Sequence, residues 1–115
     1  MDEHSRLGAA AALALRDPCN ELLLSAASIW EIAIKVGLAK LSLSIPYHQW
    51  MSQAIAGPGA SVLPISVDYA DVMATLANHH HDPFDRMLVA QAQVEGIPLV
   101  SGDTVFDRYG ILRLW

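Results

Sequence analysis

Cysteine is almost absent from this chain, since Cys19 is the single one among 115 residues. One cysteine excludes an intrachain disulfide framework and a cluster of thiolates as a metal site. Basic residues are also few: 7 Lys and Arg stand against 12 Asp and Glu, which gives a net charge of −5. This balance argues against broad electrostatic binding of nucleic acid, which depends on basic patches. It is typical of a protein with a basic partner, or of a site whose acids are offset by a cation.

Long apolar runs, leader sequences and nucleotide-binding motifs are missing as well. No apolar stretch approaches the roughly 18 residues that cross a bilayer, and the first ten residues, MDEHSRLGAA, lack the features of a signal peptide. We therefore expect a cytoplasmic protein with no membrane partner.

Neither G-x-G-x-x-G nor a Walker sequence is present, which argues against a nucleotide cofactor. The chain shows no internal repeat and no linker, so residues 1–115 are expected to form one domain.

Apolar residues make up 53% of the sequence, a content that fits strands buried on both faces. Short apolar runs alternate with longer segments of helical periodicity, which is typical of an α/β fold with a mostly parallel sheet. The expected strands are 21–26, 61–65, 97–100 and 111–115, and the expected helices are 6–16 (capped by Ser5), 28–36, 46–56, 67–78 and 82–95.

The helix expected from residue 82 has the clearest local signals. Asp82 and Pro83 are favoured at the N-cap and the first helical position, which places Asp85 at the third helical position. Gly96 is the natural C-terminal stop. After the next apolar run, Ser101-Gly102-Asp103 turns the chain, so Asp103 ends a strand.

Three acids are candidates for a site. In an open parallel sheet, strand C-termini and the following helix N-termini share the edge where ligands bind. Asp103 ends a strand and Glu31 follows one, whereas Asp85 begins a helix that is entered from a loop, so the local pattern alone does not place it at that edge. Each also has a structural interpretation: Glu31 as the partner of Ser28 in an S-x-x-E capping box, Asp85 as a capping residue and Asp103 as a turn former.

Three carboxylates at one edge would require a counter-charge. Unit charges ~4 Å apart repel by roughly 4 kcal/mol at an effective dielectric of 20, so such a cluster needs a cation, protons or hydrogen bonds. Oxygen ligands favour Mg²⁺ or Mn²⁺ over zinc.

Three segments carry a resemblance to a known family. They are SAASIWEIAIKVGLAKL at 25–41, HHHDPFDRMLVAQAQVEGIPLVSGD at 79–103 and the closing FDRYGILRLW at 106–115. The sequence resembles the PIN domain, and within it the VapC-type toxin ribonucleases of bacterial toxin–antitoxin pairs. The resemblance covers nearly the whole chain and implies a Rossmann-like α/β sandwich.

The resemblance also implies an activity and a site. It implies an endoribonuclease that hydrolyses RNA phosphodiester bonds with Mg²⁺ or Mn²⁺, and an antitoxin protein as partner. Carried over by position, Glu31, Asp85 and Asp103 match three of the family's acidic residues. Asp85 and Asp103 would be metal ligands or partners of ligands, and Glu31 would orient a ligand water or accept its proton.

One departure from the family pattern qualifies this expectation. The family begins with a strand that ends in an Asp, and this chain starts after it; neither Asp2 nor Asp17 follows an apolar run. The sequence is therefore interpreted as an N-terminally truncated PIN domain with a weakened metal site. The alternative function is a non-catalytic module that binds a protein or oligomerises. Because the absent strand would be central, we expect a homo-oligomer in which strand exchange or addition fills its place.

The residues around Asp85 leave several interpretations open. The consecutive histidines at 79–81 are expected to form a solvated or capping loop. Adjacent side chains of an extended segment point to opposite faces, so the three imidazoles cannot easily share one ion. One of these imidazoles could still lie near substrate. Arg86 is interpreted as a ligand for phosphate, a partner of an acid or an ordinary surface charge.

Overall fold

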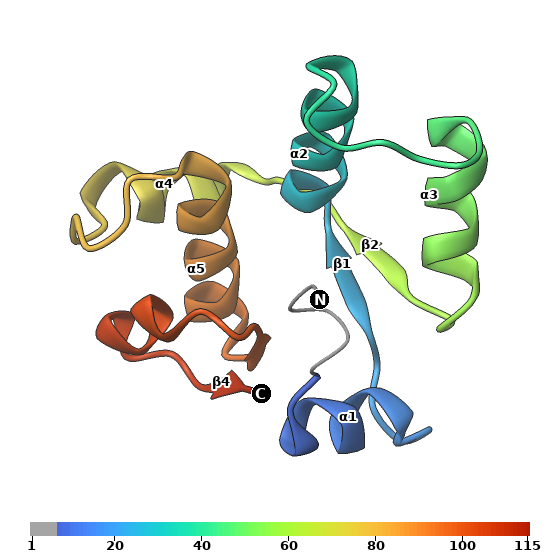
Figure 1. Cartoon of the computed structure of the whole chain (residues 1–115). Helices are drawn as coiled ribbons and strands as arrows, with labels where there is room; N and C mark the ends of the chain where they lie inside the picture. Colours follow the sequence, from blue (N-terminus) through green and yellow to red (C-terminus); the bar gives the residue numbers. More distant parts are fainter. Residues whose placement is uncertain (1–6) are drawn as a thin grey trace. The chain divides into compact units, whose positions relative to one another are not determined.

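The computed structural model describes residues 7–115 and divides into two units (Figure 1). The middle unit is Glu21–Ile65, and the terminal unit combines residues 7–20 with Ser66–Trp115. Each unit contains helices and one pair of parallel strands. This arrangement confirms the expected α/β class with parallel strands.

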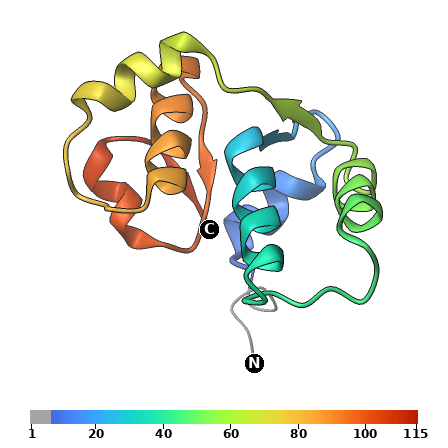
Figure 2. The same ribbon diagram turned by 90° about the horizontal axis from the view of Figure 1, so that it is seen from above.

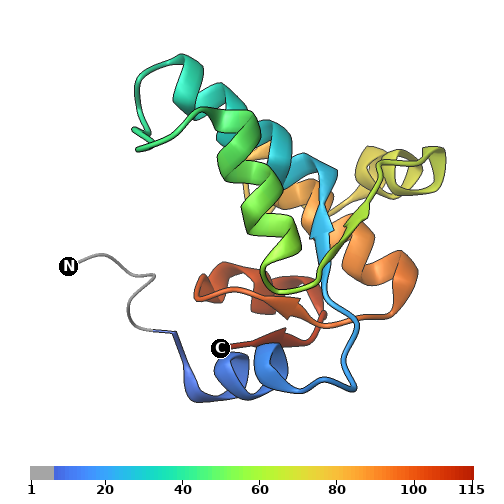
Figure 3. The same cartoon turned by 90° about the vertical axis from the view of Figure 1, so that its right-hand side faces the viewer.

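The middle unit is built around a parallel strand pair. In register, Leu24 of one strand faces Val62 of the other, and the two strands lie side by side in Figure 3. The hydroxyl of Tyr47 donates to the Ile29 carbonyl (2.7 Å) and so joins the two helices of this unit. The elements are β1 (Leu23–Ser25), α2 (Ala26–Gly37), α3 (Tyr47–Ala56) and β2 (Ser61–Leu63).

The start of α2 differs from the expected one. Ser25, the last residue of β1, is the N-cap, and its hydroxyl accepts a hydrogen bond from the Ala27 N–H (3.1 Å). The capping box predicted from Ser28 is therefore wrong: the helix begins directly where the strand ends, and the nearer serine caps it. As a result Glu31 lies in the second turn of α2, where its carboxylate pairs with Lys35 Nζ (3.1 Å).

The terminal unit combines helices with a second parallel strand pair, in which Leu99 faces Arg113 and Val100 faces Leu114. Helices α4 and α5 lie side by side, as Figure 2 shows. The elements of this unit are α1 (Ala9–Arg16), α4 (Val67–Thr75), α5 (Pro83–Glu95), β3 (Leu99–Val100), the 3₁₀ helix η2 (Thr104–Tyr109) and β4 (Arg113–Leu114).

The first helix of the chain is shorter than expected. It begins at Ala9, after the N-cap residue Gly8, and its predicted start at residue 6 and predicted cap Ser5 both lie outside the described residues. The carbonyl of Trp115 accepts a hydrogen bond from the Ala11 N–H (3.2 Å), which joins the start of α1 to the segment after β4. Gly8 is required at this approach, because a Cβ there would come 2.0 Å from the Trp115 carbonyl carbon.

The core of the terminal unit lies between α5 and η2. Val89 of α5 is fully buried, and it packs with Phe106 and Tyr109 of η2. Three partly buried side chains complete this cluster: Leu76, Leu99 and Ile111. The cluster fixes η2, and with it the turn that carries Asp103, against the helix that carries Asp85.

Candidate active site

Asp85 is positioned by the cap of α5. The Asp82 side chain accepts hydrogen bonds from the Phe84 N–H (2.8 Å) and the Asp85 N–H (3.3 Å), and Pro83 occupies the first helical position. At the other end Gly96 adopts a left-handed conformation (φ 65°). The predicted start and end of this helix are therefore confirmed. Because Asp82 caps the helix, the Asp85 carboxylate extends from its first turn toward the preceding loop.

Asp103 is positioned by the turn after β3. Its Oδ1 accepts a hydrogen bond from the Val105 N–H (3.0 Å), which caps η2, and its own N–H donates to the Ser101 hydroxyl (3.1 Å). The predicted Ser101-Gly102-Asp103 turn is thus confirmed. With Oδ1 held by the cap, the second carboxylate oxygen of Asp103 points away from η2.

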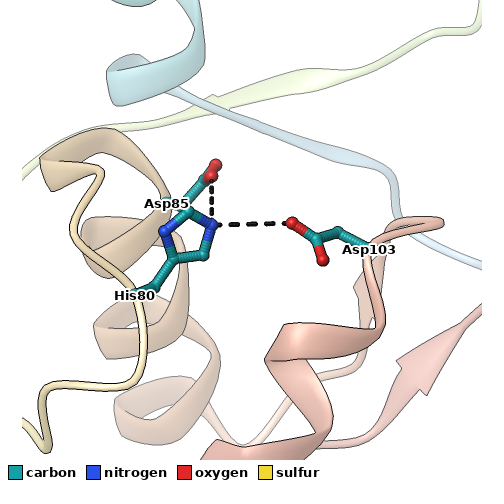
Figure 4. A group of neighbouring side chains, drawn as sticks. All are labelled: His80, Asp85 and Asp103. Carbon is teal, nitrogen blue, oxygen red and sulfur yellow. Dashed lines mark ion pairs between the residues drawn. The ribbon is translucent and has the colours of Figure 1, made fainter.

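The two carboxylates converge on the imidazole of His80 (Figure 4). His80 Nε2 lies 2.9 Å from Asp85 Oδ2 and 3.5 Å from Asp103 Oδ2. The three atoms lie within 4.8 Å of one another. His80 and Asp85 are partly buried, with side-chain exposures of 20% and 25%, whereas Asp103 is half exposed. An N–H on Nε2 reduces the repulsion between two like charges that approach this closely.

The backbone around His80 is held by Tyr109 and Arg86. The Tyr109 hydroxyl accepts hydrogen bonds from the N–H groups of His79 (3.1 Å) and His80 (2.8 Å). The Arg86 guanidinium donates to the carbonyls of Leu76 (3.2 Å), Ala77 (3.0 Å) and His80 (3.4 Å). The structure therefore gives Arg86 a role that the sequence did not suggest: it binds backbone carbonyls and orders the loop before α5.

The Tyr109 hydroxyl can be tested by removing one atom. Tyr109→Phe should lower the free energy of unfolding by about 1–3 kcal/mol, because two partly buried N–H groups lose their acceptor. It should also shift the NMR signals of the His80 imidazole. Tyr69→Phe is the matched control, since the Tyr69 hydroxyl donates to Glu95 (2.7 Å) away from the loop. Unchanged His80 signals in Tyr109→Phe would contradict the positioning role.

An ion pair supports the turn that carries Asp103. Arg113 donates to both carboxylate oxygens of Asp107 (2.9 and 3.2 Å) and to the Ser101 carbonyl (3.1 Å). The hydrogen bonds from Arg113 hold the pKa of Asp107 below its ordinary value of 3.8. Because the folded-state pKa is the lower one, the pair stabilises the fold above about pH 4, and this contribution is lost as the pH falls through the folded-state pKa.

This pH dependence gives a second prediction. Asp107→Asn should lower the melting temperature at pH 7, and the difference from the unsubstituted chain should shrink steadily as the pH is lowered below 3.8. Melting curves of both proteins between pH 7 and pH 2.5 measure it. A difference that stays constant, or grows, as the pH falls would mean that Asp107 is not stabilised in its charged form.

The structure brings together two of the three predicted acids and adds a histidine. Glu31 belongs to the middle unit, whereas Asp85 and Asp103 belong to the terminal unit. That Glu31 joins the other two acids therefore stays a prediction. His80 was not predicted as a member of this group. The only signal was its place in the run of histidines just before the Asp82 cap, which did not distinguish it from His79 or His81.

The family is decided by comparison with known families. A family model of the PIN domain matches residues 2–112. The chain belongs to the PIN domain family. Members of this family are generally nucleases and typically use a divalent metal ion. Membership of the family also implies RNA as the substrate class. No curated protein and no solved structure gives a significant match.

None of the helices between residues 7 and 115 combines the length and the apolar character that crossing a bilayer requires.

Proposed function

We propose that this PIN domain is a divalent-metal-dependent endoribonuclease of the VapC toxin type. The observation that carries the proposal is the convergence of Asp85 and Asp103, from two different elements of the terminal unit, with ligand atoms within 4.8 Å. Asp82, and not Asp85, supplies the side chain that caps α5, and Asp103 caps η2 with its other oxygen. Two acids that approach this closely are typical of a site.

The donor set fits a hard divalent ion. Two carboxylate oxygens and partial exposure suit Mg²⁺ or Mn²⁺, which retain water ligands, better than zinc. Asp85 and Asp103 would hold the ion, with Glu31 as the third acid by its sequence position. A bound ion would polarise the phosphodiester and acidify the attacking water.

The protein side chains would supply the other parts of the reaction. Asp85 and Asp103 would hold the ion near the N-terminal end of α5, where the helix dipole favours a nearby phosphate. Glu31 would accept a proton from the attacking water, the role that the sequence resemblance implies. The partly exposed position of Asp103 leaves the site open to a strand of RNA.

The biological context that we propose follows the same resemblance. The chain would act in the cytoplasm as a toxin that an antitoxin protein restrains.

In the described residues each strand has one neighbour, β1 with β2 and β3 with β4, so free strand edges are available for addition or exchange in a homo-oligomer. Size-exclusion chromatography with light scattering tests this, and a stable monomer at tens of micromolar would contradict it.

Cleavage of RNA by the purified chain tests the proposed activity. A labelled RNA incubated with the chain and Mn²⁺ or Mg²⁺ should be cut internally, and EDTA should stop the reaction. Restoring Mn²⁺ after EDTA should restore cleavage, which separates metal dependence from damage to the protein. If no RNA in a mixed pool is cut, the alternative function, a non-catalytic module that binds a protein or oligomerises, takes precedence.

A further inference from the structure

We propose that His80 is a hydrogen-bond donor to the two site carboxylates and a competitor of the cation, and not a third metal ligand. The proposal deepens the proposed function, because it concerns the same site and rests on that function for the identity of the competitor. The Nε2–H of His80 would offset the repulsion between the Asp85 and Asp103 carboxylates while no ion is present. It would therefore be a positioning residue.

The hydrogen bonds of the imidazole fix which nitrogen carries the proton. His80 Nδ1 accepts a hydrogen bond from the backbone N–H of Asp82 (3.2 Å). A nitrogen that accepts cannot itself carry a proton, so the neutral ring has its proton on Nε2. Nε2 is the atom that faces Asp85 Oδ2 (2.9 Å) and Asp103 Oδ2 (3.5 Å). The ring therefore directs an N–H, and not a lone pair, at the carboxylates.

A metal-bound histidine has the opposite arrangement. When Nε2 binds a metal, Nδ1 carries the proton and donates it to a carbonyl, a carboxylate or water. In this chain the group that faces Nδ1 is the Asp82 N–H, which is itself a donor. Two donors would then face each other. The backbone at the start of α5 thus selects the tautomer that cannot coordinate through Nε2.

The imidazole ring also cannot easily rotate so that its two nitrogens change places. The His80 N–H donates to the Tyr109 hydroxyl (2.8 Å), and the ring lies beside the buried ring of Phe106 with centroids 5.9 Å apart. A rotation that brought Nδ1 to the carboxylates would break the bond from Asp82. The contacts on both sides of His80 therefore favour the orientation that donates.

The two carboxylates are anchored without His80. Asp85 is part of α5, and Asp103 is held by the bond from the Val105 N–H (3.0 Å) to its Oδ1. Removing the imidazole should leave both side chains near their places. A cation would then not have to displace the imidazole from these two oxygens, so the variant should bind the cation more tightly.

Mn²⁺ titration of the purified full chain at one fixed pH tests the competition. His80→Ala should bind Mn²⁺ about tenfold more tightly than the unsubstituted chain, which corresponds to the loss of one charge-assisted hydrogen bond of about 1.5 kcal/mol. His80→Gln, which restores an amide N–H but no imidazole lone pair, should return the affinity toward that of the unsubstituted chain. His81→Ala, in the neighbouring exposed position, is the control and should leave the affinity unchanged.

Weaker or unchanged binding by His80→Ala would overturn the proposal, and weaker binding by both His80 variants would make His80 a ligand. A long-range ¹H–¹⁵N spectrum of the metal-free, unsubstituted chain decides the tautomer independently of any folding defect in a variant. Protonated Nε2 supports the proposal, and protonated Nδ1 overturns it. If no protein binds Mn²⁺ while Nε2 is protonated, the metal-dependent function fails and the assignment of His80 as a donor stands.

Discussion

Asp85→Asn should lower the rate of RNA cleavage by at least about a hundredfold while the protein stays folded. The substitution keeps the shape of the side chain and removes its charge, and losing one such electrostatic contact costs roughly 10²–10³ in rate. The loss of stability should be limited to about 1.5 kcal/mol from the weakened contact with His80 Nε2 (2.9 Å), because Asp82 and not Asp85 supplies the side chain that caps α5. Initial rates with Mn²⁺, together with melting curves, measure both expectations.

The matched control is Asp71→Asn, which makes the same chemical change at an exposed position of α4. It should keep the cleavage rate within about twofold, since surface substitutions away from a site have small effects. Equal rates for Asp85→Asn and the unsubstituted chain would show that the activity comes from another site or from a contaminating nuclease.

Phe106→Ala should cause a large loss of stability in the terminal unit. Phe106 is 2% exposed and packs with Val89 and Tyr109. Truncating a buried Phe costs about 3–5 kcal/mol, a large part of the roughly 5–15 kcal/mol that keeps a domain folded. The imidazole of His80 would also lose the ring beside it. Urea unfolding followed by circular dichroism measures the effect.

Phe84→Ala provides the comparison, since Phe84 is the other phenylalanine of the chain and is only partly buried. Its loss should cost clearly less than the loss of Phe106, because less apolar surface returns to water. If the two variants lost the same stability, the cluster of Val89, Phe106 and Tyr109 would not be the centre of this unit.

Local signals in the sequence predicted α5 correctly. Asp82-Pro83 at its start and Gly96 at its end each act within a few residues, through a side-chain cap, a fixed φ and a left-handed backbone. The start of α2 was predicted less well. Ser25 and Ser28 are the same residue type, so local propensity does not distinguish them as caps. The end of β1 decides between them, and it depends on pairing with a strand far along the chain.

The site was predicted in part for a similar reason. Asp103 could be placed because it ends a strand, whereas Asp85 was joined to it by the family resemblance. His80 could not, because its orientation depends on Tyr109, which lies 29 residues further along the chain and binds its N–H. Such a contact leaves no periodicity or spacing in the sequence. The place of Glu31 beside these residues follows from the family resemblance and stays a prediction.

The central claim is that Asp85 and Asp103 together form a divalent-cation site, and Mn²⁺ binding to the full chain tests it most directly. Titration followed by electron paramagnetic resonance should show a bound ion whose affinity falls about tenfold or more in Asp85→Asn and in Asp103→Asn, because each removes one attracting charge. Asp71→Asn should bind as the unsubstituted chain does. The same affinity in all four proteins would contradict the claim.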